Sequence, residues 1–230
     1  MAEKKNIVTI DGPSGAGKST ISKLLAARLR YTYLDTGAMY RVVGLQVLRG
    51  GLDLEDQGAR EKLAPLLAAL DMTLAPGEEG KETRAFLDGE DVSAAIRTPE
   101  MAMVASRVSA QAEVRKKLTE MQRTIGNNGA IVAEGRDMGT VVFPDAMHKF
   151  FLDASPMERA KRRQKQLAEN GRKIEYQEIL AQIQKRDRDY SGRSLAPLQP
   201  AEDAIIIESS EMSIDEVVSF MLAAVNKKQQ

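Results

Sequence analysis

Gly12-Pro13-Ser14-Gly15-Ala16-Gly17-Lys18-Ser19 decides the fold class of this chain. The segment fits the pattern G-x-x-x-x-G-K-[ST], in which glycines let consecutive backbone N–H groups turn inward around a phosphate. It follows the apolar run Asn6–Ile10, which predicts a buried parallel strand, and it precedes a helix predicted over Ser19–Arg30. The sequence therefore predicts a nucleotide-triphosphate site at the junction of a strand and a helix.

The loop also predicts individual roles. Lys18 would neutralise the β- and γ-phosphate oxygens, and the hydroxyl of Ser19 would hold Mg²⁺. GTPases, ATPases and kinases share this loop, but the chain contains no Asn-Lys-x-Asp string, which weighs against a GTPase. The residues expected to bind ATP at the loop are Gly12, Pro13, Ser14, Gly15, Ala16, Gly17, Lys18, Ser19 and Thr20.

Further short apolar runs alternate with helical segments along the chain. This alternation predicts an α/β fold, with a parallel sheet covered by helices on both faces. The expected strands are Tyr31–Asp35, Ala130–Ala133, Lys149–Leu152 and Ala204–Ile207, and the expected helices include Thr36–Leu48 and Glu55–Leu70. Three helix starts carry caps that fix their position: Thr98-Pro99-Glu100, Ser155-Pro156-Met157-Glu158 and the capping box Ser213-Ile214-Asp215-Glu216.

The segment Asp71–Ile96 breaks the alternation and predicts a small antiparallel insert. Asp88-Gly89 is a strong hairpin turn because glycine accepts a positive φ. The expected strands are Met72-Thr73-Leu74, Arg84-Ala85-Phe86-Leu87 and Val92-Ser93-Ala94, with breaks at Pro76-Gly77 and Gly80.

Composition excludes several chemistries. The 230 residues include no cysteine, which rules out disulfides, a thiol nucleophile, iron–sulfur clusters and cysteine-based zinc sites. The only histidine, His148, stands in a strand-like run and is interpreted as a satisfied edge or core residue. Thirty-three basic and 33 acidic residues give zero net charge, so the chain has no global attraction for nucleic acid or an anionic membrane. Met1–Lys5 does not begin a signal peptide and no apolar run reaches a membrane span, so we expect a cytoplasmic protein.

Basic residues are dense from Glu158 to Arg193. A solvated helical face accounts for part of this density. An anion site that closes over a bound phosphate accounts for it better.

Several strings together resemble bacterial cytidylate kinases over nearly the whole chain. They are Asp11 to Thr20, Leu34-Asp35-Thr36-Gly37-Ala38-Met39-Tyr40-Arg41, Asp91-Val92-Ser93-Ala94-Ala95-Ile96-Arg97, Glu134-Gly135-Arg136-Asp137-Met138-Gly139-Thr140-Val141-Val142-Phe143-Pro144 and Ala196-Pro197-Leu198. The resemblance implies transfer of the γ-phosphoryl group of ATP, with Mg²⁺, to CMP or dCMP. It also implies a five-stranded core at about 1–35, 127–155 and 195–230, an acceptor-binding region at about 36–126 with the β insert at about 71–97, and a lid at about 156–194. We expect a monomer.

The resemblance also implies roles for matching residues. Arg41, Arg136 and Arg193 would hold the acceptor phosphate, and Ser106, Arg115 and Asp137 would read cytosine. Arg186 would lie between the two phosphates, and Lys18, Arg136, Arg186 and Arg193 form the expected catalytic set. Thr36 and Tyr190 complete the acceptor site, and the lid residues Arg159, Arg162 and Arg163 would lie near ATP.

Structural alternatives remain for some of these residues. Arg41 could pair with an acid, Asp137 could be an ordinary turn residue, and Arg115 could lie on a solvated helical face. Asp35 could stand in the second shell of Mg²⁺ or simply start a helix.

One position departs from the family pattern Arg-Asp-x-x-Asp-x-x-Arg. In Arg186-Asp187-Arg188-Asp189-Tyr190-Ser191-Gly192-Arg193 a tyrosine occupies the place of the second aspartate, which in the family holds the ribose hydroxyls. Asp189 is one residue early, about 100° around a helix.

Two other functions compete with this hypothesis. A related kinase could use UMP, dTMP or a metabolite as acceptor. A phosphate-loop protein could instead bind ATP as a switch without transferring phosphate, although Arg41, Arg136, Arg186 and Arg193 would then be superfluous.

Overall fold

A computed structural model describes residues 5–56, 58–77, 82–169, 171–193 and 195–227 of the chain. The backbone divides into two compact units. Met1–Leu34 together with Asn128–Gln230 form what we call the phosphate-loop unit, and Asp35–Asn127 form the inserted unit. Each unit is described in its own frame.

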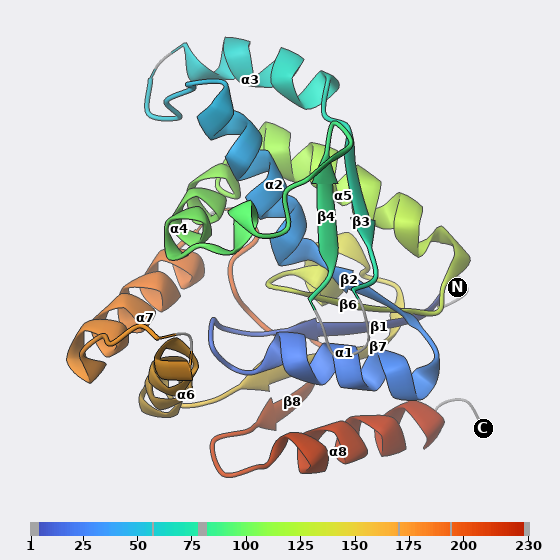
Figure 1. The fold of residues 1–230 in the computed structure, drawn as a ribbon. Helices are drawn as coiled ribbons and strands as arrows, with labels where there is room; N and C mark the ends of the chain where they lie inside the picture. The colour runs from blue at the N-terminus through green and yellow to red at the C-terminus, as the bar shows by residue number, and fades with distance from the viewer. Residues whose placement is uncertain (1–4, 57, 78–81, 170, 194, 228–230) are drawn as a thin grey trace. The chain divides into compact units, whose positions relative to one another are not determined.

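A five-stranded sheet organises the phosphate-loop unit (Figure 1). Its order is β2-β6-β1-β7-β8, and β1 pairs in parallel with both β6 and β7. The strands are β1 (Lys5–Asp11), β2 (Thr32–Asp35), β6 (Ile131–Gly135), β7 (Ala146–Asp153) and β8 (Ile205–Glu208). Because Asp11 pairs with Gly135, the segments that follow β1 and β6 leave the same edge of the sheet. The predicted α/β class with a five-stranded parallel sheet is confirmed.

Two helices bury one face of this sheet. α1 (Lys18–Leu29) and α8 (Ile214–Lys227) run beside each other in Figure 1. Leu25 of α1 and Met221 of α8 join Val8, Ile10 and Phe150 of the strands in one buried apolar cluster. β1 is therefore a core strand, and the loop that follows it starts from a rigid base.

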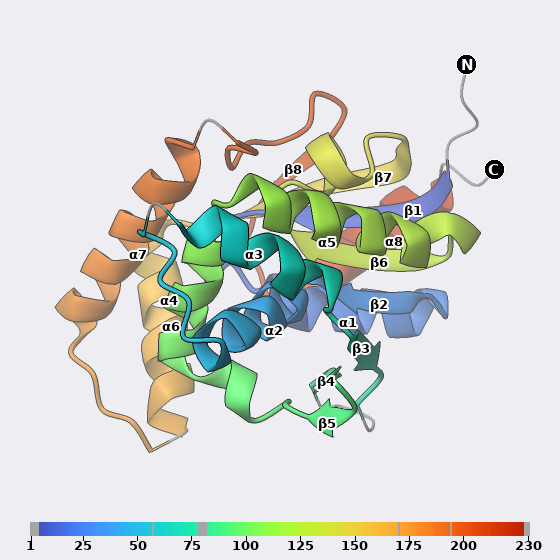
Figure 2. The same cartoon turned by 90° about the horizontal axis from the view of Figure 1, so that it is seen from above.

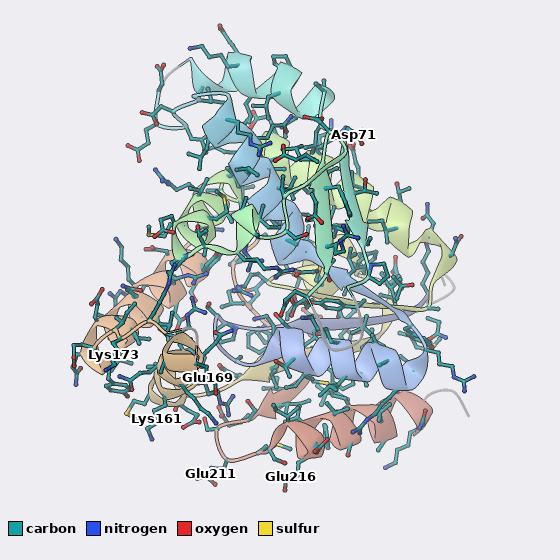
Figure 3. All side chains as sticks on the ribbon, in the orientation of Figure 1. Asp71, Lys161, Glu169, Lys173, Glu211 and Glu216 are labelled. Atoms are coloured by element: carbon teal, nitrogen blue, oxygen red, sulfur yellow. The ribbon has the colours of Figure 1, made fainter. Side chains whose placement is uncertain are left out.

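Two further helices of the same unit form a pair. α6 (Pro156–Glu169) and α7 (Tyr176–Ser191) lie side by side in Figure 2 and pack through Ala160, Ile179 and Ile183. Figure 3 shows the labelled side chains Lys161 and Lys173 on the outer surface of this part. Part of the basic density in the sequence is therefore a solvated face.

The described residues of the inserted unit form a small sheet, four α-helices and two short 3-10 helices. The antiparallel sheet has the order β3-β4-β5, and Met72 pairs with Leu87 while Phe86 pairs with Asp91. The elements are α2 (Thr36–Arg49), α3 (Ala59–Ala68), β3 (Met72–Ala75), β4 (Arg84–Leu87), β5 (Glu90–Asp91), η1 (Ala95–Arg97), α4 (Pro99–Val108), α5 (Ala112–Ile125) and, at the unit boundary, η2 (Gly126–Asn128).

The hairpin turn and the three helix caps are confirmed. Asp88 and Gly89 have φ values of 52° and 78°, as a tight two-residue turn requires. Thr98 accepts a hydrogen bond from Met101 N, and the Ser155 hydroxyl accepts one from Glu158 N. The Ser213 hydroxyl accepts from Glu216 N at 3.3 Å, while the Glu216 carboxylate accepts from Ser213 N at 2.8 Å, which completes the capping box.

Two predicted elements are wrong in their bounds. Val92-Ser93-Ala94 is not a strand, because the tight turn makes β5 begin at Glu90 and the Asp91 carboxylate then accepts from Ser93 N at 3.0 Å and starts a turn. The helix expected over Glu55–Leu70 covers only Ala59–Ala68. Asp53 and Asp56 accept hydrogen bonds from Glu55 N and Gly58 N, so local turns replace its first part. Gly80 and residues 1–4 lie outside the described residues.

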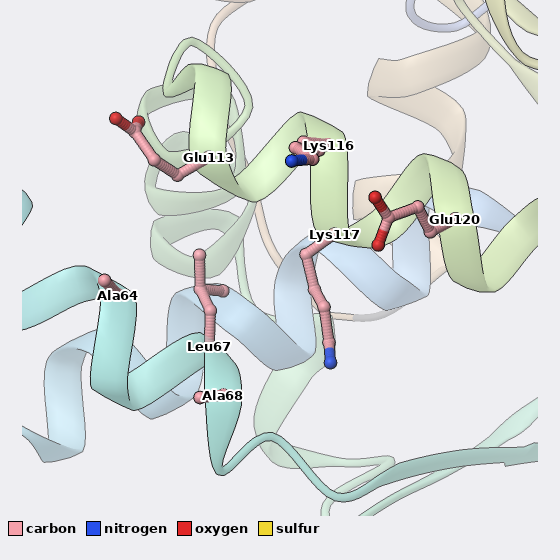
Figure 4. Close-up of a pocket in the computed structure, with 7 residues that line it drawn as sticks. All are labelled: Ala64, Leu67, Ala68, Glu113, Lys116, Lys117 and Glu120. Carbon is pink, nitrogen blue, oxygen red and sulfur yellow. The ribbon is translucent and has the colours of Figure 1, made fainter.

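A groove of about 280 Å³ lies between α3 and α5 within the inserted unit (Figure 4). It is lined by Ala64, Leu67, Ala68, Glu113, Lys116, Lys117 and Glu120. None of the predicted site residues lines it.

Candidate active site

The phosphate loop closes tightly over the end of β7. Gly12 has a φ of 148°, and a Cβ atom there would lie 2.0 Å from the carbonyl oxygen of Leu152. Gly17, at the N-terminus of α1, has a φ of 92°. Glycine is therefore required at position 12 for lack of space as well as for backbone conformation.

Lys18 folds back into this loop. Its side chain is buried, and Nζ donates a 2.7 Å hydrogen bond to the carbonyl oxygen of Pro13. Burial lowers the pKa of the Lys18 ammonium well below its ordinary value, and the nearby Arg136 lowers it further. The carboxylates of Glu134 and Asp11 oppose this shift. A bound anion would act in the same direction as these carboxylates and favour the charged lysine.

Ser19 contacts an acidic residue near the end of β6. Its hydroxyl donates to Glu134 Oε1 at 2.8 Å, and the Tyr33 hydroxyl donates to the same oxygen at 2.7 Å. Glu134 is buried. A hydroxyl and a carboxylate beside a phosphate loop are hard oxygen ligands, and Mg²⁺ sites use one or two such groups together with substrate phosphates. These residues fit the ion, and within the described ranges no cluster of three acidic, histidine or cysteine ligands occurs.

Asp11 joins the phosphate loop to the segment after β6. Its carboxylate accepts from Met138 N and from Gly139 N, both at 2.8 Å, at the start of the short helix η3 (Met138–Val142). Burial raises the pKa of Asp11 to about 6, although both backbone hydrogen bonds favour the ionised form. Asp11 thereby fixes the backbone that carries Arg136 and the buried Asp137.

Arg136 is an incompletely satisfied cation. Its Nη1 donates to Gly135 O at 3.1 Å, whereas Nε is buried without a hydrogen-bond partner among the residues that the structure describes. Burial is the largest cause that lowers the pKa of Arg136, and Arg186 lowers it as well. Since Arg186 also lowers the pKa of Lys18, three cations from separate segments converge beside the loop.

Two arginines of α6 hold the phosphate loop by its carbonyl groups. Arg159 donates to Ser14 O at 3.2 Å and to Ala154 O at 2.8 Å, and Arg162 donates to Ala16 O at 3.4 Å and to Ser209 O at 2.6 Å. Arg159 also makes a two-point ion pair with Asp187 of α7. Arg163 lies further out and donates to Gln166 on its own helix.

Tyr190 brings two of the predicted site arginines together. The guanidinium carbons of Arg193 and Arg136 lie 4.1 Å and 5.3 Å from the centroid of its ring. Tyr190 is the last but one residue of α7, four positions after Arg186.

The inserted unit places its predicted residues in two groups. Around the start of α2, Asp35 accepts from Ala38 N at 2.8 Å, so it caps this helix, and Thr36 is buried. A Cβ atom at Gly37 would lie 3.6 Å from Nη2 of Arg41 and 3.3 Å from Oδ1 of Asp35. The guanidinium of Arg41 thus lies near Gly37 in the first turn of α2.

The second group lies at the junction of α4 and α5. The hydroxyl of Ser109 donates to Ser106 O at 2.8 Å, and Arg115 Nη1 donates to Ser109 O at 3.4 Å. Ser109 therefore connects the two residues expected to read cytosine from this unit. Arg115 is partly buried, and its guanidinium reaches back to the turn between α4 and α5.

The family model described as cytidylate kinase matches residues 8–227. The chain belongs to the cytidylate kinase family. The cytidylate kinase of Geobacter sp. strain M21 is 48% identical over 228 residues, which cover 99% of this chain and 96% of that protein. The cytidylate kinase of Aliivibrio salmonicida strain LFI1238 is 47% identical over 222 residues, which cover 96% and 97%.

A likeness of fold alone extends further. The crystal structure of an uncharacterized protein from Eubacterium ventriosum ATCC 27560 has a TM-score of 0.52 and 12% identity, covering 97% of this chain and 99% of that one. None of the helices in the described ranges combines the length and the hydrophobicity that a membrane span requires.

Sequence reasoning did not place four polar residues in the site of this cytidylate kinase family member. Asp11, Glu134 and Asp187 are acids that contact or orient predicted site residues, and Ser109 links Ser106 to Arg115. Asp11 and Glu134 carried a readable signal, because each is an acid near the carboxyl end of an apolar strand in a parallel sheet. Asp187 and Ser109 carried none, since their partners are distant in sequence or are backbone groups.

Proposed function

We infer that this chain transfers the γ-phosphoryl group of ATP to CMP or dCMP, which gives ADP and CDP or dCDP. Family membership over residues 8–227 supports the reaction. Within the site, the observation that best supports this reaction is the buried Nε of Arg136, which lacks a hydrogen-bond partner among the described residues. A buried donor left unpaired costs about 1–3 kcal/mol, so an anionic acceptor oxygen belongs there.

The donor nucleotide binds at the phosphate loop in this proposal. The segment Gly12–Thr20 surrounds the phosphates and offers them the backbone N–H groups of its non-proline residues, and Lys18 exchanges the carbonyl oxygen of Pro13 for phosphate oxygens. Arg159 and Arg162 support ATP binding indirectly, because they donate hydrogen bonds to carbonyl groups of the loop. Arg163 lies near ATP from the more exposed side of α6.

The acceptor is held by arginines and read by short polar groups. Arg41, Arg136 and Arg193 bind the acceptor phosphate, because a guanidinium offers a permanent charge and paired donors. Ser106, Arg115 and Asp137 read the cytosine, and Thr36 and Tyr190 complete the acceptor site. Asp137 suits this role because it is buried and sits on backbone that Asp11 fixes.

The chemical step needs charge neutralisation more than proton transfer. An oxygen of the acceptor phosphate bonds to the γ-phosphorus as the bond from that phosphorus to the β-bridging oxygen breaks. The nucleophile is already an oxyanion, so no general base is required. Lys18, Arg136, Arg186 and Arg193 stabilise the charge that spreads over the moving phosphoryl group. Ser19, with Glu134 beside it, would hold Mg²⁺, which supplies further charge neutralisation when bound.

Water must be kept from the transferring group. We propose that the segment 156–194, which carries α6 and α7, excludes it as a lid. We further propose that the protein acts as a monomer in the cytoplasm, where ATP and CMP are available to it.

An acceptor panel tests this function. Release of ADP from ATP and Mg²⁺ is measured with CMP, dCMP, UMP, dTMP or no acceptor. We expect the highest kcat/KM with CMP or dCMP and little ADP without an acceptor. A higher value with UMP or dTMP would assign a different acceptor, and equal ADP release without any acceptor would identify an ATP-driven switch.

A further inference from the structure

We propose that Tyr190 is a positioning residue whose aromatic ring holds Arg136 and Arg193 together for the acceptor phosphate. The inference rests on the proposed function and adds to it a residue that positions the phosphate-binding arginines. Arg193 lies 4.1 Å and Arg136 5.3 Å from the ring centroid, and both distances are within the range of cation–π attraction. The two guanidinium groups come from different segments, one after β6 and one after α7.

The ring solves an electrostatic problem that the site creates. Before a phosphate binds, Arg136 and Arg193 are like charges, and Arg186 adds a third cation that lowers the pKa of Arg136. An aromatic ring carries partial negative charge on its faces, so it attracts both guanidinium groups and reduces the cost of keeping them close. It adds no carboxylate that would compete with the phosphate for the same donors.

The backbone fixes the ring at this place. Tyr190 belongs to the last turn of α7, and its carbonyl oxygen accepts a 3.2 Å hydrogen bond from Leu198 N, beyond the end of the helix. Arg193 lies three positions after Tyr190, just beyond the end of α7, and its guanidinium turns back onto the ring. The ring is partly buried, which strengthens the attraction relative to a fully exposed pair.

A role for the aromatic ring of Tyr190 and a role for its hydroxyl group lead to different predictions. If the ring acts on the phosphate-binding arginines, Tyr190→Phe keeps the function and Tyr190→Leu loses it. The loss should fall on ligands that carry a phosphate, because the arginines bind phosphate and not the nucleoside. Cytidine, which lacks the phosphate, should then bind both variants equally well.

The experiment compares CMP and cytidine binding to the wild-type chain, Tyr190→Phe and Tyr190→Leu by calorimetry, with cytidine also measured as a competitor of CMP. We expect Tyr190→Leu to weaken CMP binding by about 5- to 30-fold, the value of one or two cation–π contacts, and Tyr190→Phe to stay within about twofold of wild type. Cytidine binding should be unchanged in both variants. Tyr176→Leu, on the same helix, is the matched control, because that ring packs on the apolar contact of α6 and α7.

Three outcomes would overturn the proposal. Equal losses in Tyr190→Phe and Tyr190→Leu would assign the effect to the hydroxyl group. Parallel losses for CMP and cytidine would place the ring against the nucleoside. Unchanged CMP binding in Tyr190→Leu would leave the ring without a role. Thermal denaturation checks folding, and Tyr190→Met, whose flexible side chain fills irregular space, replaces a leucine variant that does not fold. If the wild-type chain prefers another nucleotide to CMP, the proposed acceptor is wrong. Binding of that nucleotide and of its nucleoside to the same variants then still tests the role of the Tyr190 ring.

Discussion

Arg159 and Asp187 form a two-point ion pair, with Nη2 to Oδ2 at 2.6 Å and Nη1 to Oδ1 at 3.1 Å. Arg159 is only 3% exposed, and the same guanidinium group reaches the phosphate loop at Ser14 O. Because Asp187 directly follows Arg186, this pair ties the phosphate loop to the helix that carries the cation proposed to lie between the two phosphates. The contact gives α7 a fixed point one residue from that cation.

Asp187→Asn should reduce both stability and turnover. Removing one partner of a largely buried pair leaves the other charge uncompensated, so we expect a loss of about 1–3 kcal/mol in the free energy of unfolding, and a lower kcat because Arg186 is less well placed. Arg159→Lys should lower stability and turnover as well, since the ammonium group of lysine cannot make the two-point contact with Asp187. Asp215→Asn, which breaks the exposed pair with Arg28, is the control and should cost less than about 1 kcal/mol. Urea unfolding measures the loss of stability, and steady-state kinetics measure the loss of turnover. Equal losses in Asp187→Asn and in the control Asp215→Asn would contradict the prediction.

Lys18→Met should separate activity from stability. We expect phosphoryl transfer to fall by several orders of magnitude, because a preorganised positive charge is lost from the transition state. The free energy of unfolding should not fall with it, since burial already disfavours the charged lysine in the folded protein. Lys227→Met, at the exposed end of α8, is the control. Near-normal turnover in Lys18→Met would be incompatible with the role given to the phosphate loop.

Asp137 should set the preference for cytosine over uracil. If it accepts a hydrogen bond from the cytosine amino group, UMP places a carbonyl oxygen opposite a buried carboxylate, at a cost of about 1–3 kcal/mol or roughly 5- to 150-fold in kcat/KM. Asp137→Asn should narrow the ratio of CMP to UMP, because the amide can turn to donate. Asp145→Asn replaces an exposed carboxylate nearby in sequence and should leave the ratio as it is. A ratio that stays the same in Asp137→Asn would remove Asp137 from the base pocket.

The enzyme should discriminate only weakly between ribose and deoxyribose in the acceptor. Tyr190 offers no carboxylate to the ribose and its ring already contacts Arg136 and Arg193, so we expect kcat/KM for CMP and dCMP to differ by less than about tenfold, near 1.4 kcal/mol. Tyr190→Asp should widen the preference for CMP. Asp189→Asn should change little, because Asp189 is exposed on α7. A strong preference for CMP that disappears only in Asp189→Asn would mean that Asp189 reaches the sugar.

Asp11 should make stability depend on pH in an unusual direction. Its folded pKa of about 6 lies above the ordinary value of 3.8, so the folded chain binds the proton more tightly than the unfolded chain. The favourable contribution is complete below pH 4 and is lost as the pH rises to about 6, by about 3 kcal/mol. Asp11→Asn removes this titration, so the difference in unfolding free energy between wild type and variant should change over that pH window. Urea titrations at pH 4, 5, 6 and 7 measure it, and a constant difference would refute the assignment.

The sequence predicted the strands and the phosphate loop well because their signals are local. Apolar runs such as Asn6–Ile10 and the glycines of the loop depend only on neighbouring residues and on burial. Val92–Ala94 failed because the two-residue turn at Asp88-Gly89 determines where the next strand begins, and β-propensity does not report that register.

In the predicted site, too, the local features were predictable from the sequence and the long-range contacts were not. The positions of Lys18 and Ser19 follow from the loop pattern, whereas the partners of Arg159 and Tyr190 depend on how α6, α7 and the segment after β6 pack. The exchange of an aspartate for Tyr190 was visible in the sequence. Its contact with two arginines was not, because one of them, Arg136, lies more than 50 positions away.

The division of the chain has a consequence for its synthesis. Residues 35–127 form one uninterrupted unit, whereas the phosphate-loop unit needs segments from both ends of the chain. Ile7 pairs with Ile131, about 120 positions later, so β1 leaves the ribosome roughly 6–25 s before its first neighbouring strand at typical translation rates. All of the inserted unit is synthesised within that interval. The phosphate loop can take its final shape only when β6 and β7 have followed, so a chain truncated before residue 128 contains every residue of the loop motif and cannot form its sheet.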